Sequence, residues 1–336
     1  MKDVYDILRE WKKRSGEKCQ SGSDFALATL VRAKGSTYRR PGARMLICND
    51  GKTVGSLSAG CLEEEVALRA RQVLLTGEPA LMSFDTRKRF GCAGKIDIFI
   101  ECAAENFFVD LAENLDARRC CAAITRFAGD KVGTRIQGFD YEHPPSHSYG
   151  VPGEHEHELM QRIHPPVRLI IFGGGPDSVP LHLLANSLGW QTFEIIDANQ
   201  LPFEPDEWTA AIVKSHNYGR DFAVLRSLLP LDLHYVGLVG PRKRRNQLLS
   251  DLLDLGLTIN AGFFAPAGLD LGAETPEEIA LAIVSEIQRV FATTSGESLR
   301  DRKIPIHASS TPSFRPKSRN HVAASKGDTA GSRRIN

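Results

Sequence analysis

The chain has 336 residues, 42% of them hydrophobic and 25% charged, with a net charge of +1 at pH 7. This length suits two domains of ordinary size, and no apolar run approaches the roughly 20 residues that cross a bilayer. The seven cysteines are scattered and form no C-x-x-C pair, which argues against a disulfide framework and a zinc ribbon. We therefore expect a cytoplasmic protein that does not enter a membrane.

The first half of the chain predicts short strands and helices. Apolar residues at positions 4, 7, 8 and 11 have helical spacing, and acidic residues interrupt them, so the N-terminus predicts an amphipathic docking helix rather than a signal peptide. A second helix begins after Cys61 and ends at Gly77. Strands are expected over residues 25–33, 43–52, 95–101 and 120–127, with a further helix over 107–115. These elements predict an α+β domain over residues 1–140.

Residues 141–166 are rich in proline and histidine and lack core periodicity. They predict an interdomain linker with an embedded hairpin or short helix. The histidines of this stretch are His143, His147, His155, His157 and His164. The spacing of His155 and His157 is compatible with a metal site, but exposed polar histidines explain the same pattern.

From residue 167 the pattern changes to alternating strands and helices. A continuous apolar strand runs into Gly173-Gly174-Gly175, a helix follows, and a second strand ends at Asp197. Further buried-type strands are expected over 208–216 and 234–242, and Thr275 caps a final helix. The alternation predicts a doubly wound parallel sheet over residues 167–299.

The chain ends in a basic stretch over residues 300–336. From Asp301 onward it has eight lysines and arginines against two aspartates, with many Ser, Pro and Gly residues. This composition predicts a disordered, solvated tail. We expect no specific nucleic-acid binding from it.

The glycine turn is the first candidate site. It fits G-x-G-x-x-G with Ser178 in the third position, between a strand and a helix, and Asp197 stands where a ribose-binding acid would lie. The carboxylate of Asp177 opposes a phosphate there. His216 and Arg242 follow the next strands, at the edge where doubly wound folds bind their ligands.

Two further candidates lie in the N-terminal domain. Arg39, Arg40 and Arg44 flank Pro41-Gly42 in a positively charged turn that suits a phosphate or another oxoanion. Cys61 stands at a helix N-terminus, which favours a thiolate. Three glutamates follow it and oppose that effect.

The histidine distribution limits the roles that Cys61 can have. A thiol nucleophile normally needs a base, and residues 1–142 contain no histidine. A Cys–His pair must therefore recruit its histidine from the linker or the second domain. A thiolate that coordinates a soft metal needs no such base.

Six segments together resemble the XdhC/CoxI family, in the family's order from about Phe25 to about Val290. They are GSTYRRPGARM, GSLSAGCLEEE, FGCAGKIDIFIE, KSHNYGRD, YVGLVGPRKR and APAGLDLGAETPEEIALAIVSEI. The resemblance implies an N-terminal XdhC/CoxI domain and a C-terminal Rossmann-like domain. It also implies an accessory protein that binds molybdenum cofactor, cooperates with a cysteine desulfurase and delivers the cofactor to an apo molybdenum hydroxylase such as xanthine dehydrogenase.

The resemblance also implies site residues. The family's Gly-Cys-x-Glu signature falls on Gly60, Cys61 and Glu63, and the other matching positions are Arg40, Pro41, Gly42, Gly173, Gly175, His216 and Asp221. The chain departs from the family pattern at Ala59 and Ala93, where glycine is usual, and both replacements are small.

From the resemblance and the residues together we expect a chaperone rather than an enzyme, with a redox or sulfur-transfer step left open. The cofactor, as the plain pterin or as a dinucleotide, would lie between the domains of a homodimeric protein. Cys61 would contact the molybdenum or carry sulfur, and Glu63 would orient the thiol. The residues expected to bind the cofactor are Arg40, Gly42, Gly60, Gly173, Gly175, Asp197, His216 and Arg242.

Two rival functions are kept. One is an NAD(P)-dependent oxidoreductase that uses the Rossmann domain. The other is a scaffold that holds desulfurase and hydroxylase together without binding the cofactor.

Overall fold

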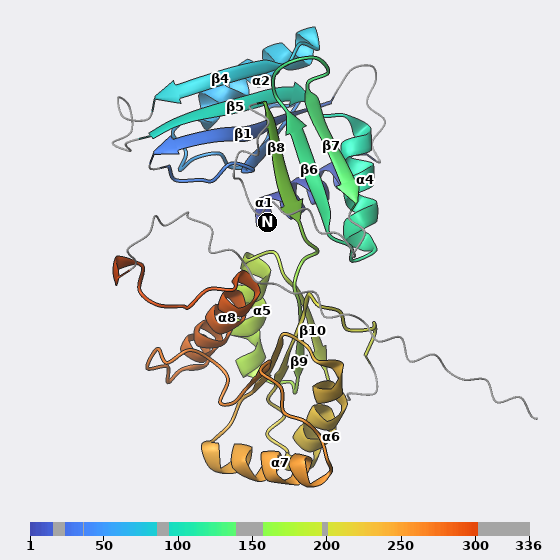
Figure 1. Cartoon of the computed structure of the whole chain (residues 1–336), viewed down its shortest axis with the longest axis vertical. Coiled ribbons are helices and arrows are strands. Elements are labelled where there is room, and N and C mark those ends of the chain that lie inside the picture. The colour runs from blue at the N-terminus through green and yellow to red at the C-terminus, as the bar shows by residue number, and fades with distance from the viewer. Residues whose placement is uncertain (16–23, 36, 86–93, 139–156, 197–200, 302–336) are drawn as a thin grey trace, which may run out of the picture.

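The computed structural model describes residues 1–15, 24–35, 37–85, 94–138, 157–196 and 201–301. The chain forms two lobes, joined where strand β8 leaves the upper lobe and β9 begins the lower one (Figure 1). No helix among these residues is both long enough and apolar enough to span a membrane.

The N-terminal lobe contains two sheets. A five-stranded antiparallel sheet has the order β3-β2-β1-β5-β4, and a three-stranded sheet has the order β7-β6-β8. The strands are β1 (Phe25–Gly35), β2 (Arg44–Cys48), β3 (Thr53–Gly55), β4 (Ala80–Asp85), β5 (Gly94–Cys102), β6 (Cys121–Arg126), β7 (Gly133–Gly138) and β8 (Glu158–Ile163). The large sheet is covered on one face by α2 (Glu63–Thr76), and α1 (Lys2–Arg14) and α4 (Glu105–Asp116) pack on its other face. The strands predicted over residues 25–33, 43–52, 95–101 and 120–127 and the three predicted helices are confirmed as β1, β2, β5, β6, α1, α2 and α4. Strands β3, β4, β7 and β8 carry weaker patterns that we did not predict.

Strand β8 corrects the predicted linker. It pairs antiparallel with β6, from Cys121↔Ile163 to Arg126↔Glu158, and buries Leu159 and Ile163. Residues 158–163 therefore belong to the N-terminal lobe rather than to a linker over 141–166. Two buried side chains four residues apart are too short a pattern to predict this strand, because its partner β6 lies more than thirty residues away.

A β-bulge interrupts β1 between Leu30 and Arg32. Leu30 and Ala33 both pack into the core under α2, while Val31 packs on the opposite face with Phe99. The extra residue therefore turns Arg32 and Lys34 away from the core under α2. β-Bulges commonly redirect side chains in this way.

The C-terminal lobe confirms the predicted doubly wound fold. Its five strands are all parallel in the order β10-β9-β11-β12-β13. They are β9 (Arg168–Phe172), β10 (Gln191–Ile195), β11 (Thr209–Val213), β12 (Tyr235–Leu238) and β13 (Phe263–Phe264). The core beneath α5 (Val179–Ser187) and α8 (Pro276–Ala292) lies on one face, and α6 (Tyr218–Leu228) and α7 (Arg242–Asp254) cover the other. The predicted Thr275 cap is present as a capping box with Glu278.

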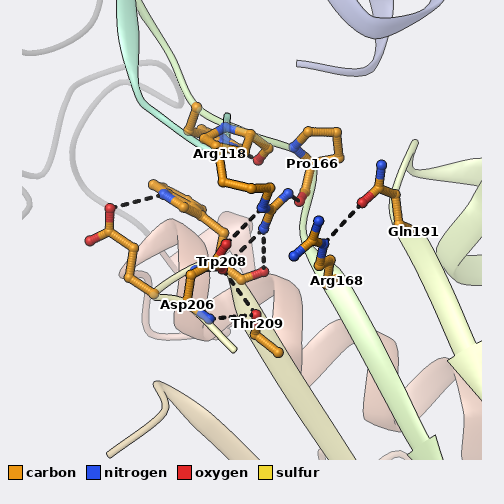
Figure 2. Close-up of polar contacts among 10 residues, drawn as sticks. Arg118, Pro166, Arg168, Gln191, Asp206, Trp208 and Thr209 are labelled. Atoms are coloured by element: carbon orange, nitrogen blue, oxygen red, sulfur yellow. Dashed lines mark hydrogen bonds and ion pairs between the residues drawn. The ribbon is translucent and has the colours of Figure 1, made fainter. Parts of the chain in front are cut away.

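The two lobes are joined by a partly buried ion pair at the amino ends of the parallel strands. Arg118, after α4, donates to Asp206 through Nε at 2.7 Å and through Nη2 at 3.0 Å, and also to the Pro166 carbonyl (Figure 2). Their side chains are only 12% and 15% exposed. Figure 2 places Arg168 and Gln191, the first residues of β9 and β10, in the same contact region.

Aromatic packing continues this contact. The His164 ring stacks on Trp208 with centroids 4.1 Å apart, and Tyr5 Oη of α1 donates to the His164 carbonyl at 2.9 Å. Gly189, after α5, lies so close to α1 that a Cβ there would come within 3.1 Å of the Tyr5 ring. These contacts fix the amino edge of the Rossmann sheet against the N-terminal lobe.

Candidate functional site

Two sequence motifs meet at one end of the antiparallel sheet. The hairpin between β1 and β2 carries the arginine-proline-glycine turn, and the loop after β3 carries Cys61. Because Met45 at the start of β2 pairs with Gly55 at the end of β3, both loops leave the sheet at the same end. Arg39 Nη1 donates a hydrogen bond to Ser56 Oγ at 3.0 Å, which joins the two loops directly.

A pocket of about 1090 Å³ opens beside this hairpin. It is lined by the ends of β1 and β5, the hairpin itself, the start of α1 and part of β8. Its basic lining residues are Arg32, Lys34, Arg39, Arg40, Arg44 and Lys95. The carboxylates in the lining face arginines, since Asp3 pairs with Arg39 and Asp97 lies 3.6 Å from Arg32 Nη1. The excess of positive charge suits an anionic ligand.

Gly42 and Gln161 form part of the pocket wall. Gly42 has φ +96°, a conformation that glycine adopts readily, and a Cβ there would lie 2.8 Å from Gln161 Cδ. Arg44 Nη1 donates to both Gln161 Oε1 and the Gly42 carbonyl. The side chain that β8 brings into the lobe therefore holds the turn in place.

Arg44 is buried beneath the pocket, and burial lowers its pKa to about 10. A chain of hydrogen bonds leads from Arg44 Nη2 to Thr125 Oγ1 at 3.4 Å, on to Thr134 Oγ1 at 3.0 Å, and then to Glu101. Burial also raises the pKa of Glu101. Arg44 thus supports the pocket from below, whereas Arg40 is exposed in its lining.

The Cys61 loop is organised by Glu63. Glu63 Oε1 accepts the N–H groups of Leu57 at 3.1 Å and Ser58 at 2.8 Å, and Oε2 accepts Ser58 Oγ–H at 2.7 Å. Ser58 Oγ in turn accepts the N–H of Cys61 at 3.1 Å. Partial burial acts to raise the pKa of Glu63, but these hydrogen bonds hold it below its usual value. Glu63 therefore acts on Cys61 through Ser58 and the backbone.

Cys61 itself is exposed, and Gly60 before it has φ +103° with open space where a Cβ would be. This loop leaves room for a bulky group to approach the thiol. His157, the first described residue of the predicted linker, lines the pocket beside Arg32, with 3.4 Å between Arg32 Nη2 and His157 Nδ1. The N-terminal lobe therefore contains a histidine, which the count over residues 1–142 misses.

The sequence left a metal site at His155 and His157 as an alternative to exposed polar histidines. His155 lies outside the described residues. Within the described ranges, no group of three or more His, Cys, Asp or Glu side chains is arranged to hold a metal ion.

At the glycine turn of the Rossmann lobe, Gly173 has a packing role. It has φ +108°, and a Cβ there would lie 2.6 Å from Ser215 Cα at the end of β11. Close packing of the turn on the neighbouring strand therefore requires glycine, whether or not a ligand binds.

Two carboxylates lie over the same turn. A Cβ on Gly174 would come within 2.7 Å of Glu194 Oε1, and one on Gly175 within 2.8 Å of Asp177 Oδ1. A pyrophosphate in this place would face both negative charges. Asp197, the predicted ribose acid, lies outside the described residues.

The helix start at the glycine turn also offers few donors. Pro176 and Pro180 have no N–H group, the N–H of Ser178 bonds to the Gly175 carbonyl, and that of Val179 bonds to the Pro176 carbonyl. Most donors that would bind a phosphate at a helix N-terminus are thus missing or already used.

Other charged groups at this edge are paired. The buried Lys214 Nζ lies 2.8 Å from Asp177 Oδ1, and His216 Nε2 lies 3.7 Å from Asp177 Oδ2. Asp177 is partly buried, which acts to raise its pKa, but its bonds to Lys214 and His216 hold the pKa below the usual value. His216 is 69% exposed and has φ +54°.

Asp221 and Arg242 occupy different positions at this edge. Asp221 is buried, where it accepts from Ser215 and pairs with Arg244. Arg242 is exposed at the start of α7.

The two groups of predicted residues are far apart within one chain. The N-terminal lobe contacts the amino ends of the parallel strands, whereas Gly173, His216 and Arg242 follow the carboxyl ends. Five-residue strands separate these edges by roughly 15 Å. The expected cofactor site between the domains is therefore not formed in this arrangement, because the glycine edge faces away from the lobe that carries Cys61.

Comparison with known proteins identifies the family. The model of the XdhC and CoxI family matches residues 19–85, and the model of the XdhC Rossmann domain matches residues 169–287, together more than half of the chain. The chain belongs to the XdhC and CoxI family. In this XdhC/CoxI protein the first match contains both the arginine turn and the Cys61 loop, and the second contains the parallel sheet except for Arg168, the first residue of β9.

Two relatives and one solved structure are similar to this XdhC/CoxI protein over most of their own length. A protein of Bacillus subtilis described as a probable xanthine dehydrogenase subunit is 29% identical, covering 79% of this chain and 92% of the relative. The molybdenum cofactor insertion chaperone PaoD of Escherichia coli is 26% identical, covering 82% and 86%. A crystal structure described as a xanthine dehydrogenase from Bacillus halodurans has the same fold, with a TM-score of 0.70 and 24% identity over 89% of this chain and 98% of that one.

Several pocket residues of the XdhC/CoxI protein were missed by sequence reasoning. Lys34 and Lys95 stand beside glycines at strand ends, and Gln161 lies in the predicted linker. Alternation along β1 could have pointed to Arg32 and Lys34 as one face. The bulge that directs this face into the pocket has no sequence signal of its own.

Proposed function

We propose that this protein binds molybdenum cofactor as cargo and inserts it into an apo molybdenum hydroxylase. The chaperone PaoD, similar over 82% of this chain, supports this proposal by its name. The structural observation that carries it is the hydrogen bond of Arg39 to Ser56, which joins the cationic pocket to the Cys61 loop.

The chemistry of the cargo fits these two features. Molybdenum cofactor is a pterin with a dithiolene-bound metal at one end and a phosphate at the other. Its phosphate needs cationic partners, and a thiolate is a ligand suited to a soft metal centre. The pocket volume of about 1090 Å³ is at the upper end of ordinary small-molecule sites, which favours a ligand of this size.

In this proposal Cys61 contacts the molybdenum and Glu63 fixes the position of Cys61 by organising its loop. Gly60 keeps the approach to the thiol open. The finer parts of the proposal are a cysteine desulfurase that sulfurates the bound cofactor, a homodimeric chaperone, a cytoplasmic location and acceptance of the dinucleotide form. NAD(P) chemistry at the Rossmann edge receives no support from a turn that places Glu194 and Asp177 against a pyrophosphate.

The test is to isolate the full-length protein from molybdate-fed cells, oxidise it, and measure pterin fluorescence and molybdenum. We expect both at a defined stoichiometry in the wild type, with much less retained in Cys61→Ala and Cys61→Ser. Cys102→Ala is the matched control, because Cys102 belongs to the same lobe and its thiol donates to the Val73 carbonyl.

Wild-type protein without pterin and molybdenum would exclude the chaperone function. Equal retention in the Cys61 variants and the control would remove Cys61 from the site, while the function itself would stand.

A further inference from the structure

Lys34 and Lys95 face each other at the rim of the pocket. Lys34 on β1 is the direct cross-strand partner of Lys95 on β5, next to the pair Gly35↔Gly94. Both are exposed and both line the pocket. Like charges directly opposite on neighbouring strands destabilise a sheet. A pair placed in this way lowers stability unless an anion binds between the two ammonium groups.

The neighbouring pair along the same strands shows the contrast. Arg32 pairs with Asp97 in register, and their side chains form an ion pair at 3.6 Å. Strand β5 lies between β1 and β4, and Lys95 pairs in register with Asp85 of β4 as well as with Lys34 of β1. Yet across the described part of the chain no carboxylate lies within 4.0 Å of the ammonium group of Lys34 or Lys95.

The bulge in β1 creates this arrangement. Without the extra residue, strand alternation would send Arg32 and Lys34 to the face that packs under α2. With it, Arg32 and Lys34 share the face of Lys95, and all three line the pocket. A backbone irregularity that directs two cations into one pocket indicates a binding role rather than a role in packing.

We propose that Lys34 and Lys95 bind the phosphate group of a phosphate-ester ligand, with Arg40 in the same pocket as a third cation. In the proposed function, on which this assignment rests, the ester is the phosphate end of the pterin cofactor. Opposed Cβ atoms lie about 5 Å apart, so both flexible ammonium groups can reach one tetrahedral phosphate. The ligand then extends along the pocket toward Arg39, whose partner Ser56 begins the loop of Cys61.

The first test uses inorganic pyrophosphate as the probe. Full-length protein purified from cells that make no molybdenum cofactor is titrated by calorimetry at low salt. The double variant Lys34→Ala/Lys95→Ala should bind pyrophosphate at least about tenfold more weakly, since each charge-assisted contact contributes substantially. Its affinity should also depend less steeply on salt.

The matched control is Lys12→Ala/Lys243→Ala, which removes the same charge outside the pocket, where Lys12 pairs with Asp116. It should bind pyrophosphate as the wild type does. The pocket variant, Lys34→Ala/Lys95→Ala, should also melt at a temperature no lower than that of the wild type, because it removes the repulsion between the two ammonium groups. Equal pyrophosphate affinity in the pocket variant and the control would overturn the assignment.

A second readout separates this inference from the proposed function. The same variants are isolated from molybdate-fed cells and analysed for pterin. Wild type without pterin, together with weaker pyrophosphate binding in the pocket variant, would leave the phosphate site intact and remove the chaperone function. Wild type with pterin, and a pocket variant that retains both pterin and pyrophosphate, would overturn the assignment alone.

Discussion

At the residue scale, a single side chain, that of Glu63, organises the Cys61 loop through several hydrogen bonds. The carboxylate of Glu63 accepts hydrogen bonds from Leu57, Ser58 and the Leu62 N–H group, so the loop preceding α2 folds around it. The carboxylate of Glu63 therefore directs its hydrogen bonds to groups of the loop itself. Glu63 therefore acts on the position of Cys61 through Ser58 and the backbone, which is the role that we propose for it.

Gly42 gives a sharp prediction at the same scale. Gly42→Ala adds both backbone strain at φ +96° and a contact with Gln161, whereas Gly60→Ala adds strain at φ +103° with open space around it. We expect Gly42→Ala to reduce the free energy of unfolding by about 1–3 kcal/mol more than Gly60→Ala, because overpacking adds to strain. Urea unfolding of the two variants measures this difference.

The contribution of the contact can be isolated with Gln161→Ala. The loss of stability caused by Gly42→Ala should be smaller in the Gln161→Ala background than in the wild type, because the clashing side chain is gone. A Gly42→Ala protein as stable as Gly60→Ala would show that Gln161 moves aside without loss.

At the element scale, the start of α5 does not provide an open phosphate site although its sequence suggests one. The glycine turn has the expected strand before it and helix after it, as the motif predicts. Two prolines and two carboxylates then decide its chemistry. Asp177 is part of the turn and was expected from the sequence, whereas Glu194 becomes visible only when β10 and the turn are side by side.

We therefore expect NADH to bind weakly, with a Kd above about 1 mM. The double variant Asp177→Asn/Glu194→Gln should bind NADH more tightly, because it removes the charges that oppose the pyrophosphate. Quenching or enhancement of NADH fluorescence on titration measures both affinities. Tight binding by the wild type, unchanged in the double variant, would contradict this interpretation of the turn.

At the scale of the whole molecule, we expect the contact between the lobes to be sensitive to pH. Burial lowers the pKa of His164 to about 4, while its Nδ1 lies 2.8 Å from the Pro165 carbonyl and its ring stacks on Trp208. The unfolded chain has an ordinary histidine pKa near 6.5. As the pH falls below that value, the unfolded state takes up a proton that the folded state resists, so stability is lost from about pH 6.5 down to about pH 4.

We expect the free energy of unfolding to fall by about 2 kcal/mol between pH 7 and pH 5 because of this group. His164→Gln should lose that part of the pH dependence. Denaturant unfolding at pH 7 and at pH 5 measures the change in the free energy of unfolding. An equal change in the wild type and in His164→Gln would contradict the prediction.

The fold was largely predictable because its signals are local. Helical spacing at positions 4 to 11, the Thr275 cap and the alternation of strands with helices each depend on neighbouring residues. Strand β8 was not predictable, because its pairing with β6 bridges a long separation in sequence. The same holds for His157 and Gln161, which reach the pocket only through that pairing.

The sequence by itself determined the family, the two lobes and the residue types that suit an anion and a soft metal. Only the tertiary structure decided which of them share a site. Strand pairing places the arginine turn beside the Cys61 loop, and the bulge in β1 directs Lys34 into their pocket. The interface through Arg118 and Asp206 turns the glycine edge away, because it fixes the opposite ends of the parallel strands. Residue type sets the chemistry that is available, and long-range pairing sets where it can act together.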